Sequence, residues 1–457
     1  MAGILAVSFL LGGCSGGKDP EEGTLGYVRG FLGGVAADEP RAATVGRDVL
    51  SAGGNAVDAA VAVFLTMAVT RSSVAGLGSS GQCLVFNDES KRVDALDFTA
   101  PPGLPTAPRA MFALHAKYGK LRWEQLVAPS ETLARFGFPV SRGFARDLAA
   151  AATTIAQSPD LARLYRQADG GLPGEGVFFQ QLDLAATLGV LRRAPGELYN
   201  GNFARQYVEA AQAKGMSITA ESLRGYAPQW RNTIQVNYGL ITSHFSQNAG
   251  GAVAASMWTS LAAQGGYEKA RAEAKSAVIN DAALRALPQG LTQSPPDRPS
   301  AGASFIVADR YSGTVACAFS MGRPFGTGQE MAGTGIIPAA ALSGGEELSL
   351  VSMLSINPNV HKIFFAAAAS GGAAAPTAMI TTALGVLAGG ASLRDASAAP
   401  RSHPVAPGTI AQEPQVSLGL VNGFNCPKGL ISPGGEKPDG VCEVAIDRRG
   451  FGLSLQQ

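Results

Sequence analysis

The sequence has few charged residues, few histidines and no long apolar run, and each shortage argues against a class of function. Charged residues make up 16% of the 457 residues and the formal net charge is +1, so no basic stripe or block supports nucleic-acid binding. The 4 histidines are scattered without metal-site spacing and are expected to be surface or core residues. They are His115, His244, His361 and His403. Hydrophobic residues reach 46%, which indicates a compact globular protein with a large core.

The start of the chain predicts export. The apolar run Ile4–Leu11 is too short to span a bilayer as a helix, and it ends in small residues before Cys14. This pattern is typical of a bacterial lipoprotein signal over residues 1–14, followed by a flexible tether over residues 15–27. An ordinary unstructured N-terminus is the alternative. In the lipoprotein interpretation Cys14 carries lipid, and the rest of the chain lies in the bacterial cell envelope, facing the periplasm.

The remaining cysteines divide into two pairs. Cys426 and Cys442 flank a turn-rich stretch, and in an oxidising compartment they are expected to form a disulfide. Closing that loop is worth on the order of 3 kcal/mol. Cys83 and Cys317 lie inside apolar, strand-like runs, and we expect both to be buried free thiols.

The hydrophobic pattern predicts strands and helices in two successive blocks. Gly53 and Gly54 end a first helix, and Asn55 caps a second one that is apolar nearly all round and therefore buried. Strands at 82–86 and 92–98 should pair, and strands at 303–308 and 314–319 should form a hairpin after a proline-rich connector. The predicted helices are 41–52, 56–69, 123–136, 143–157, 182–191, 201–215, 267–287 and 377–387. This order predicts helices packed outside two facing sheets.

Short segments in a fixed order carry a resemblance to a known family. They include Gly53–Ala62, Gly76–Gly81, Asp97-Phe98 with Ala100-Pro101, Gly196–Gly201, Phe325–Gly328 and Ser370–Gly372. Each segment alone is weak evidence, but together they are collinear over most of the chain. On these segments the chain resembles the γ-glutamyltranspeptidases.

The resemblance implies a fold and a chemistry. The fold would be a four-layer αββα sandwich of the N-terminal-nucleophile hydrolase type, with a large-subunit-like region over 28–295 intertwined with a small-subunit-like region over 296–457. A precursor of this family cuts itself once, and the threonine at the new N-terminus attacks the substrate with its own α-amine as base. A glycine pair supplies donors for the oxyanion, and an arginine with Asn, Gln, Ser and Asp side chains holds the γ-glutamyl group. No cofactor is implied.

The residues that would carry this chemistry are mostly replaced. Counting back from Phe325–Gly328 places the nucleophile position at Gly302, which has no hydroxyl, and the substrate-binding arginine becomes Thr99. The other pocket positions fall on Ser320, Gly322, Ala341, Ser343, Val351 and Ser352. Gly371 and Gly372 persist as the oxyanion pair, although a tight strand-to-helix turn needs glycine anyway. Hydroxyls that could rescue catalysis are those of Ser304, Ser300 and Thr292.

Two functions therefore remain open. In the first, the protein is a catalytically silent envelope lipoprotein, kept for binding or assembly with an unidentified envelope partner. In the second, it is a divergent γ-glutamyl transferase or hydrolase that uses a non-standard nucleophile on glutathione-type amides. The first predicts an intact chain without turnover of a γ-glutamyl anilide, whereas the second predicts two fragments, cut between Thr292 and Ser304.

Overall fold

Two antiparallel sheets face each other in the computed structural model, which describes residues 33–263, 275–286, 301–343, 345–406, 409–413, 418–426 and 442–457. The first sheet has 7 strands, in the order β17 (Leu453–Gln456), β1 (Gly33–Ala37), β9 (Gly302–Asp309), β10 (Thr314–Ser320), β2 (Ser80–Asn87), β3 (Arg92–Asp97) and β6 (Gln229–Arg231). The second has 6, in the order β16 (Glu443–Ala445), β15 (Leu420–Asn425), β12 (Lys362–Ser370), β11 (Val351–Asn357), β8 (Ile241–Phe245) and β7 (Ile234–Tyr238). Strands from the large- and small-subunit-like regions thus lie side by side in both sheets.

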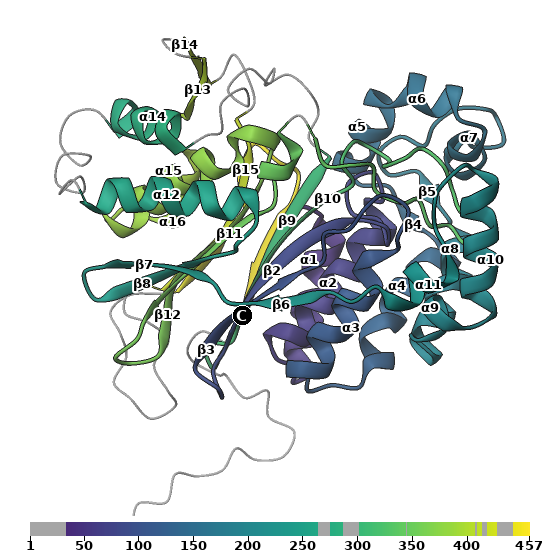
Figure 1. Ribbon diagram of the computed structural model, residues 1–457, viewed down its shortest axis with the longest axis horizontal. Coiled ribbons are helices and arrows are strands. Elements are labelled where there is room, and N and C mark those ends of the chain that lie inside the picture. Colours follow the sequence, from purple (N-terminus) through teal and green to yellow (C-terminus); the bar gives the residue numbers. More distant parts are fainter. Residues whose placement is uncertain are drawn as a thin grey trace, which may run out of the picture. The chain divides into compact units, whose positions relative to one another are not determined.

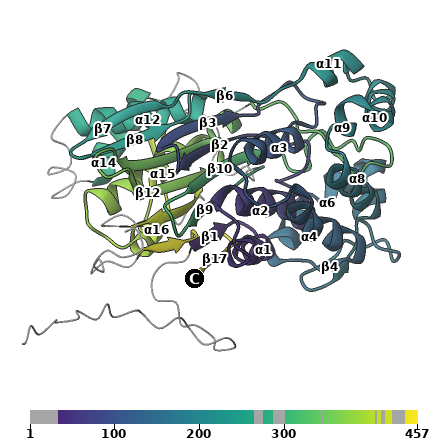
Figure 2. The same ribbon diagram turned by 90° about the horizontal axis from the view of Figure 1, so that it is seen from below.

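Helices cover the outer face of each sheet, so the layers run helix, sheet, sheet, helix (Figures 1 and 2). Outside the first sheet lie α1 (Pro40–Ser51), α2 (Ala56–Thr70), α3 (Thr106–Tyr118), α4 (Trp123–Phe136), α5 (Arg142–Ala150), α6 (Ala152–Gln157), α7 (Pro159–Tyr165), α8 (Leu182–Arg193), α9 (Glu197–Asn200), α10 (Asn202–Ala213) and α11 (Ala220–Gly225). Outside the second lie α12 (Ala249–Ala263), α14 (Lys275–Ala286), α15 (Ala375–Leu387) and α16 (Leu393–Ala398). The smaller pairs are β4 (Phe138–Pro139) with β5 (Phe178–Phe179) and β13 (Ser402–Ala406) with β14 (Thr409–Gln412). The predicted αββα sandwich is confirmed.

Alternation along the strands divides the core into three parts. On β9, Phe305 faces the helices of the first sheet, whereas Ile306 faces the second sheet. On β12, Phe365 faces the helices of the second sheet, and Ala366 faces the first sheet. The space between the sheets is therefore filled by every second residue of each strand, and this fixes which positions can reach a site there.

The second helix is buried because its sequence is apolar and its start is capped. Every residue of α2 is buried. The side chain of Asn55 accepts the N–H groups of Val57 and Asp58, at 3.0 and 2.9 Å, and the Asp58 carboxylate accepts the N–H of Asn55 at 3.0 Å. This reciprocal cap satisfies backbone donors that a helix start leaves open, as the sequence predicted for Asn55.

The expectation of free thiols at Cys83 and Cys317 is wrong. The two residues lie directly opposite each other on β2 and β10, with Cα atoms 4.1 Å apart, and their sulfurs are bonded. The sequence showed that both lie in strands but not that the strands are neighbours. Cys426 and Cys442 are also bonded, and this is the pair that the sequence predicted.

Several element predictions need correction. The helix predicted over 143–157 is divided at Ala151 into α5 and α6. The sequence analysis also missed α12, which, unlike α2, has two glycines in its first turn, Gly250 and Gly251, and glycine disfavours a helix. Of the helix predicted over 267–287, the described part is α14.

Some predictions concern residues outside the described part of the chain. These are the signal and tether with Cys14, the connector with Thr292 and Ser300, and the turn-rich stretch between Cys426 and Cys442. Within the described ranges, every helix is too short or too polar to cross a bilayer.

Candidate functional site

Gly302, the position that the resemblance assigns to the nucleophile, is the first residue of β9. It pairs with Ser320, the last residue of β10. Because side chains alternate along a strand, Gly302 shares a face with Ser304 and Ile306, and that face points between the two sheets. A side chain at position 302 would therefore reach the interior of the sandwich, but glycine brings no hydroxyl there.

Ser304, the first alternative hydroxyl, is fully buried and bonded on both sides. Its hydroxyl donates to the carbonyl oxygen of Ala368 on β12 at 3.2 Å and accepts from the side-chain amide of Asn422 on β15 at 2.9 Å. The same amide donates to the Asp38 carboxylate at 2.8 Å. These bonds join the two sheets, so Ser304 is a structural link rather than an accessible nucleophile.

The Asp38 carboxyl continues this link toward the helices. It accepts the N–H of Ser304 at 2.8 Å, while the Arg71 guanidinium donates to the backbone oxygen of Asp38 at 2.9 Å and pairs with Asp147 at 2.9 Å. Burial raises the pKa of the Asp38 carboxyl, and the charge of Arg71 and the bond from Asn422 oppose that rise. This buried network stabilises the junction between the sheets and the helices.

The carboxyl group of Glu346 lies next to Gly302. Glu346 begins a short 3-10 helix, Glu346–Leu348, directly after Gly345, whose φ is +96°. One carboxylate oxygen, Oε2, accepts the hydroxyls of Ser320 at 2.9 Å and Ser349 at 3.2 Å. The backbone N–H of Ala301, which immediately precedes Gly302, also lies near this carboxyl and acts to lower its pKa. We call Ala301, Gly302, Ser320, Glu346, Ser349 and Gly372 the Glu346 cluster.

The environment of Glu346 differs from that of a surface carboxylate. Burial is the main cause that raises the pKa of its carboxyl group, and the charge of Glu347 adds to the rise. The bonds from Ser320, Ser349 and Ala301 act in the opposite direction. The sequence did not identify Glu346, because a glutamate in a Gly- and Glu-rich loop is typical of a solvated turn.

The glycine pair of the resemblance lies in the same place. Gly371 and Gly372 connect β12 to α15, with φ values of +126° and +65°. The N–H of Gly372 donates to the Ser349 hydroxyl at 2.7 Å, and that hydroxyl donates to Glu346. A Cβ on Gly371 would lie 2.3 Å from the Cα of Gly419. Packing therefore requires glycine at 371, and the Gly372 donor is used within the protein.

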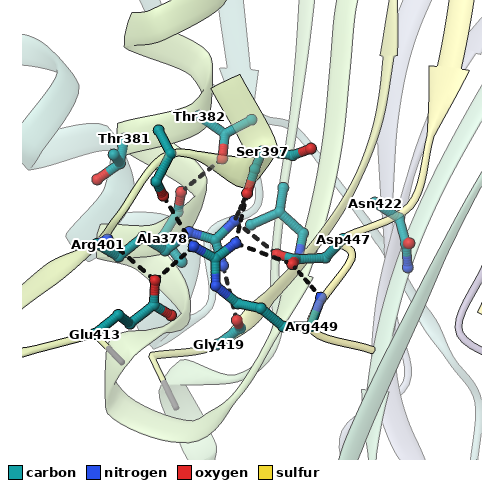
Figure 3. A network of polar contacts seen from close by, with 12 residues as sticks. Ala378, Thr381, Thr382, Ser397, Arg401, Glu413, Gly419, Asn422, Asp447 and Arg449 are labelled. Carbon is teal, nitrogen blue, oxygen red and sulfur yellow. Dashed lines mark hydrogen bonds and ion pairs between the residues drawn. The ribbon is translucent and has the colours of Figure 1, made fainter. Parts of the chain in front are cut away.

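Behind this turn, a buried ion-pair network holds Gly419 in place (Figure 3). The guanidinium of Arg401 contacts the Asp447 carboxylate at 2.6 Å, with both side chains 1% exposed, and it donates to the Gly419 carbonyl oxygen at 2.8 Å. Arg449 contacts the other oxygen of Asp447 at 3.1 Å and also contacts Glu413. The network is structural: it fixes the backbone against which Gly371 packs.

The remaining pocket positions are either bonded within the protein or exposed. The N–H of Gly322 donates to the Ser320 hydroxyl at 2.9 Å, and a Cβ on Gly322 would lie 2.4 Å from the backbone oxygen of Ala340, so no larger side chain fits there. Thr99 is exposed and donates to its neighbour Asp97 at 2.8 Å. Ser352 is buried and accepts from Gln82 at 2.7 Å. Ala341 and Ser343 are exposed loop residues.

A guanidinium that the sequence did not identify lies near Thr99. Arg231 on β6 pairs with Asp97 at 3.3 Å. Together with Gln82, Ser246 and Asn248 they line a small cavity of about 10 Å³, which has room for about one water molecule. The cavity is too small for a γ-glutamyl group.

Three of the histidines bond other groups of the protein, and the fourth is exposed. His244 bonds Thr233 at 2.7 Å and His403 bonds Thr377 at 3.0 Å, and both rings are buried. His115 bonds a backbone oxygen at 2.7 Å, and His361 is exposed in a turn. Among the residues that the structure describes, no group of three or more His, Cys, Asp or Glu side chains could hold a metal ion.

Sequence comparison connects the first half of the chain to one family. The family model for gamma-glutamyltranspeptidase matches residues 42–102 and 99–269. Glutathione hydrolase 3 of Arabidopsis thaliana is 28% identical over 250 residues, which is 49% of this chain and 39% of that protein. The glutathione hydrolase proenzyme of Escherichia coli K12 is 30% identical over 247 residues, or 48% of this chain and 42% of that protein. The matches thus cover less than half the length of these relatives.

Structural comparison extends the likeness to nearly the whole chain. The crystal structure of cephalosporin acylase from Bacillus halodurans superposes with a TM-score of 0.73 and 19% sequence identity, over 96% of this chain and 98% of that one. This likeness concerns the fold, and it includes the region of the Glu346 cluster, which the family model does not reach.

Proposed function

The chain belongs to the γ-glutamyltranspeptidase family, and from that premise we propose that it is a catalytically silent member, retained for binding or assembly. The observation that carries the proposal is Gly302 at the nucleophile position. Acyl transfer of the family type needs a hydroxyl beside a free amine, and glycine supplies no hydroxyl. The hydroxyl two residues further along β9, that of Ser304, is buried and bonded to the opposite sheet.

The hydrogen bonds that the donors near Gly302 already make within the protein support the same proposal. An oxyanion hole works when its N–H groups point at an unoccupied position where charge develops. Here the Gly372 N–H is bonded to Ser349, and the Ser320 hydroxyl is bonded to Glu346. When ionised, the Glu346 carboxylate beside the nucleophile position would also repel the negative charge of an oxyanion.

The residues at the substrate-binding positions support it further. The position of the substrate arginine is Thr99, which bonds Asp97 in its own loop. The position of Gly322 has no room for a polar side chain that could bind substrate. A γ-glutamyl group would then keep its carboxylate and ammonium unpaired, which typically costs several kcal/mol of binding.

The test is chain integrity and turnover of the purified full-length protein. We expect one chain on a denaturing gel after reduction and no hydrolysis of a γ-glutamyl anilide, with an active glutathione hydrolase assayed in parallel. Two fragments with a new N-terminal Ser or Thr, together with turnover, would contradict the proposal. Those results would favour the divergent transferase or hydrolase.

We further propose that the protein is a lipoprotein of the cell envelope, anchored through Cys14 and facing the periplasm. The small residues before Cys14 support this, and two disulfides are typical of an oxidising compartment. Metabolic labelling with a fatty-acid analogue should mark the wild type but not Cys14→Ala. Equal labelling of the two, or recovery from the cytosol, would exclude the anchor.

A further inference from the structure

The Glu346 cluster presents converging hydrogen-bond donors to one carboxyl group. The hydroxyl of Ser320 comes from the end of β10 and that of Ser349 from the loop before β11, and the N–H of Ala301, the residue before β9, lies near the same carboxyl. Three segments that are distant in the sequence therefore meet at this group. Such convergence is typical of a binding site rather than of a single surface hydrogen bond.

The two hydroxyls are oriented before any carboxylate binds. The Ser320 oxygen accepts the N–H of Gly322 at 2.9 Å, and the Ser349 oxygen accepts the N–H of Gly372 at 2.7 Å. A serine hydroxyl has one proton to donate. Because each oxygen already accepts from the backbone, that proton is directed at the carboxyl group between them.

We propose that Ala301, Ser320 and Ser349 form a carboxylate-binding cradle, and that the side chain of Glu346 is its built-in occupant. The cradle then binds small monocarboxylates of acetate size when Glu346 is shortened, and it is closed to them in the wild type. The inference goes beyond the proposed silent function, because it concerns binding and holds whether or not the protein turns over a substrate.

The backbone around Glu346 fits a built-in occupant. Gly345 has a φ of +96°, a conformation that glycine adopts readily and that directs the next residue toward the cradle. Leu348 is fully buried, and the side-chain amide of Asn248 donates to the backbone oxygen of Leu350 at 2.7 Å. The loop is thus fixed on both sides of Ser349, so the occupant is held by packing as well as by its hydrogen bonds.

The experiment removes the Glu346 carboxylate by mutation and supplies acetate from solution in its place. Glu346→Ala removes a CH2–COO⁻ unit, which has the same heavy atoms as acetate. The Tm of the full-length protein is measured against sodium acetate, with sodium chloride at the same ionic strength. We expect Glu346→Ala to have a lower Tm than the wild type and to recover it saturably with acetate, while the wild type responds equally to both salts.

Matched variants separate the cradle from general salt effects. Glu347→Ala removes the adjacent carboxylate, which accepts the N–H of Gly345 at 3.1 Å, and it should respond equally to both salts. Glu346→Gln keeps the cradle filled and should also show no acetate-specific shift. Adding Ser320→Ala to Glu346→Ala removes a donor and should abolish the recovery by acetate.

The inference is overturned if Glu346→Ala responds to acetate no more than Glu347→Ala does. If Glu346→Ala is recovered unfolded, it is refolded in acetate and in chloride in parallel. A higher yield in acetate supports the cradle, and equal yields overturn it. Turnover in the wild type would refute the silent function without affecting this result, because the thermal shift does not depend on catalysis.

Discussion

Gly302 can be tested directly by giving it the missing hydroxyl. We predict that Gly302→Thr stays one chain and still fails to hydrolyse a γ-glutamyl anilide. The new hydroxyl would face Glu346, and Thr99 and Gly322 would still offer the substrate's charges no partner. A substrate that is not held over the hydroxyl loses the benefit of orientation, which lowers the activation barrier by about 7–11 kcal/mol at best. Release of the anilide chromophore is the measurement, and activity in this single variant would show that the pocket is intact.

The buried histidines should make stability depend on pH. Burial lowers the pKa of His244 and His403 from 6.5 to about 4. The two rings therefore bind more protons in the unfolded chain between these values, so their contribution to the free energy of unfolding is complete above pH 6.5 and is lost as the pH drops toward 4. Each ring contributes at most about 3 kcal/mol.

The measurement is denaturant unfolding at a series of pH values. We expect His403→Gln to flatten the dependence, whereas His361→Gln, which changes an exposed side chain, should leave it unchanged. A His403→Gln variant with the same pH dependence of stability as the wild type would contradict the burial argument.

The candidate site could be predicted from sequence only in part. Counting from Phe325–Gly328 assigned the nucleophile position to Gly302, which stays a prediction, and the structure places Ser320 and Gly372 in one cluster with it. Glu346 could not be found this way, because its contacts depend on how a loop without periodicity packs against β10. The disulfide between Cys83 and Cys317 was not predicted either, because the sequence does not show which distant strands are neighbours in a sheet.

At the scale of elements, local patterns determined the helices better than the sheets. The predicted helix over 123–136 has the same bounds as α4, and the reciprocal cap at Asn55 begins α2. In contrast, β7, β8 and β11 were not predicted. Their pairing partners are distant in the sequence, so their identity as strands depends on the sheet that they join.

The network around Asp447 indicates that the stability of the C-terminal elements depends on the charge of this one side chain. Asp447→Asn removes the carboxylate that both Arg401 and Arg449 contact and leaves Glu413 as the remaining ion-pair partner of Arg449 (Figure 3). Breaking a buried pair in this way typically lowers the free energy of unfolding by about 3–5 kcal/mol. Asp395→Asn, at an exposed position on α16, should change it by less than about 1 kcal/mol. Similar effects of the two substitutions would mean that the network contributes little.

At the scale of the whole molecule, the Cys83–Cys317 disulfide joins two central strands of the first sheet. It spans 234 residues of sequence, whereas Cys426–Cys442 spans 16. We predict that Cys83→Ala/Cys317→Ala lowers the free energy of unfolding by about 3–5 kcal/mol, because a longer closed loop restricts the unfolded chain more. Alanine is chosen because both sites are fully buried and apolar.

Denaturant unfolding of the two double variants, with Cys426→Ala/Cys442→Ala as the second, checks the order of the effects. A smaller destabilisation for Cys83→Ala/Cys317→Ala than for the short-loop pair would show that unfolded-state entropy does not dominate.

The same disulfide also decides what a break in the backbone would do. Cys83 lies before residues 287–300 and Cys317 after them, so the bond bridges the region in which a family precursor would be cut. A protein nicked there would remain one covalent molecule, with both pieces tied through the middle of the sheet. It would migrate as a single species until a thiol reductant was added. A cut in the connector would therefore break the backbone without separating the molecule. A protease that made this cut could not release either piece unless the disulfide was also reduced.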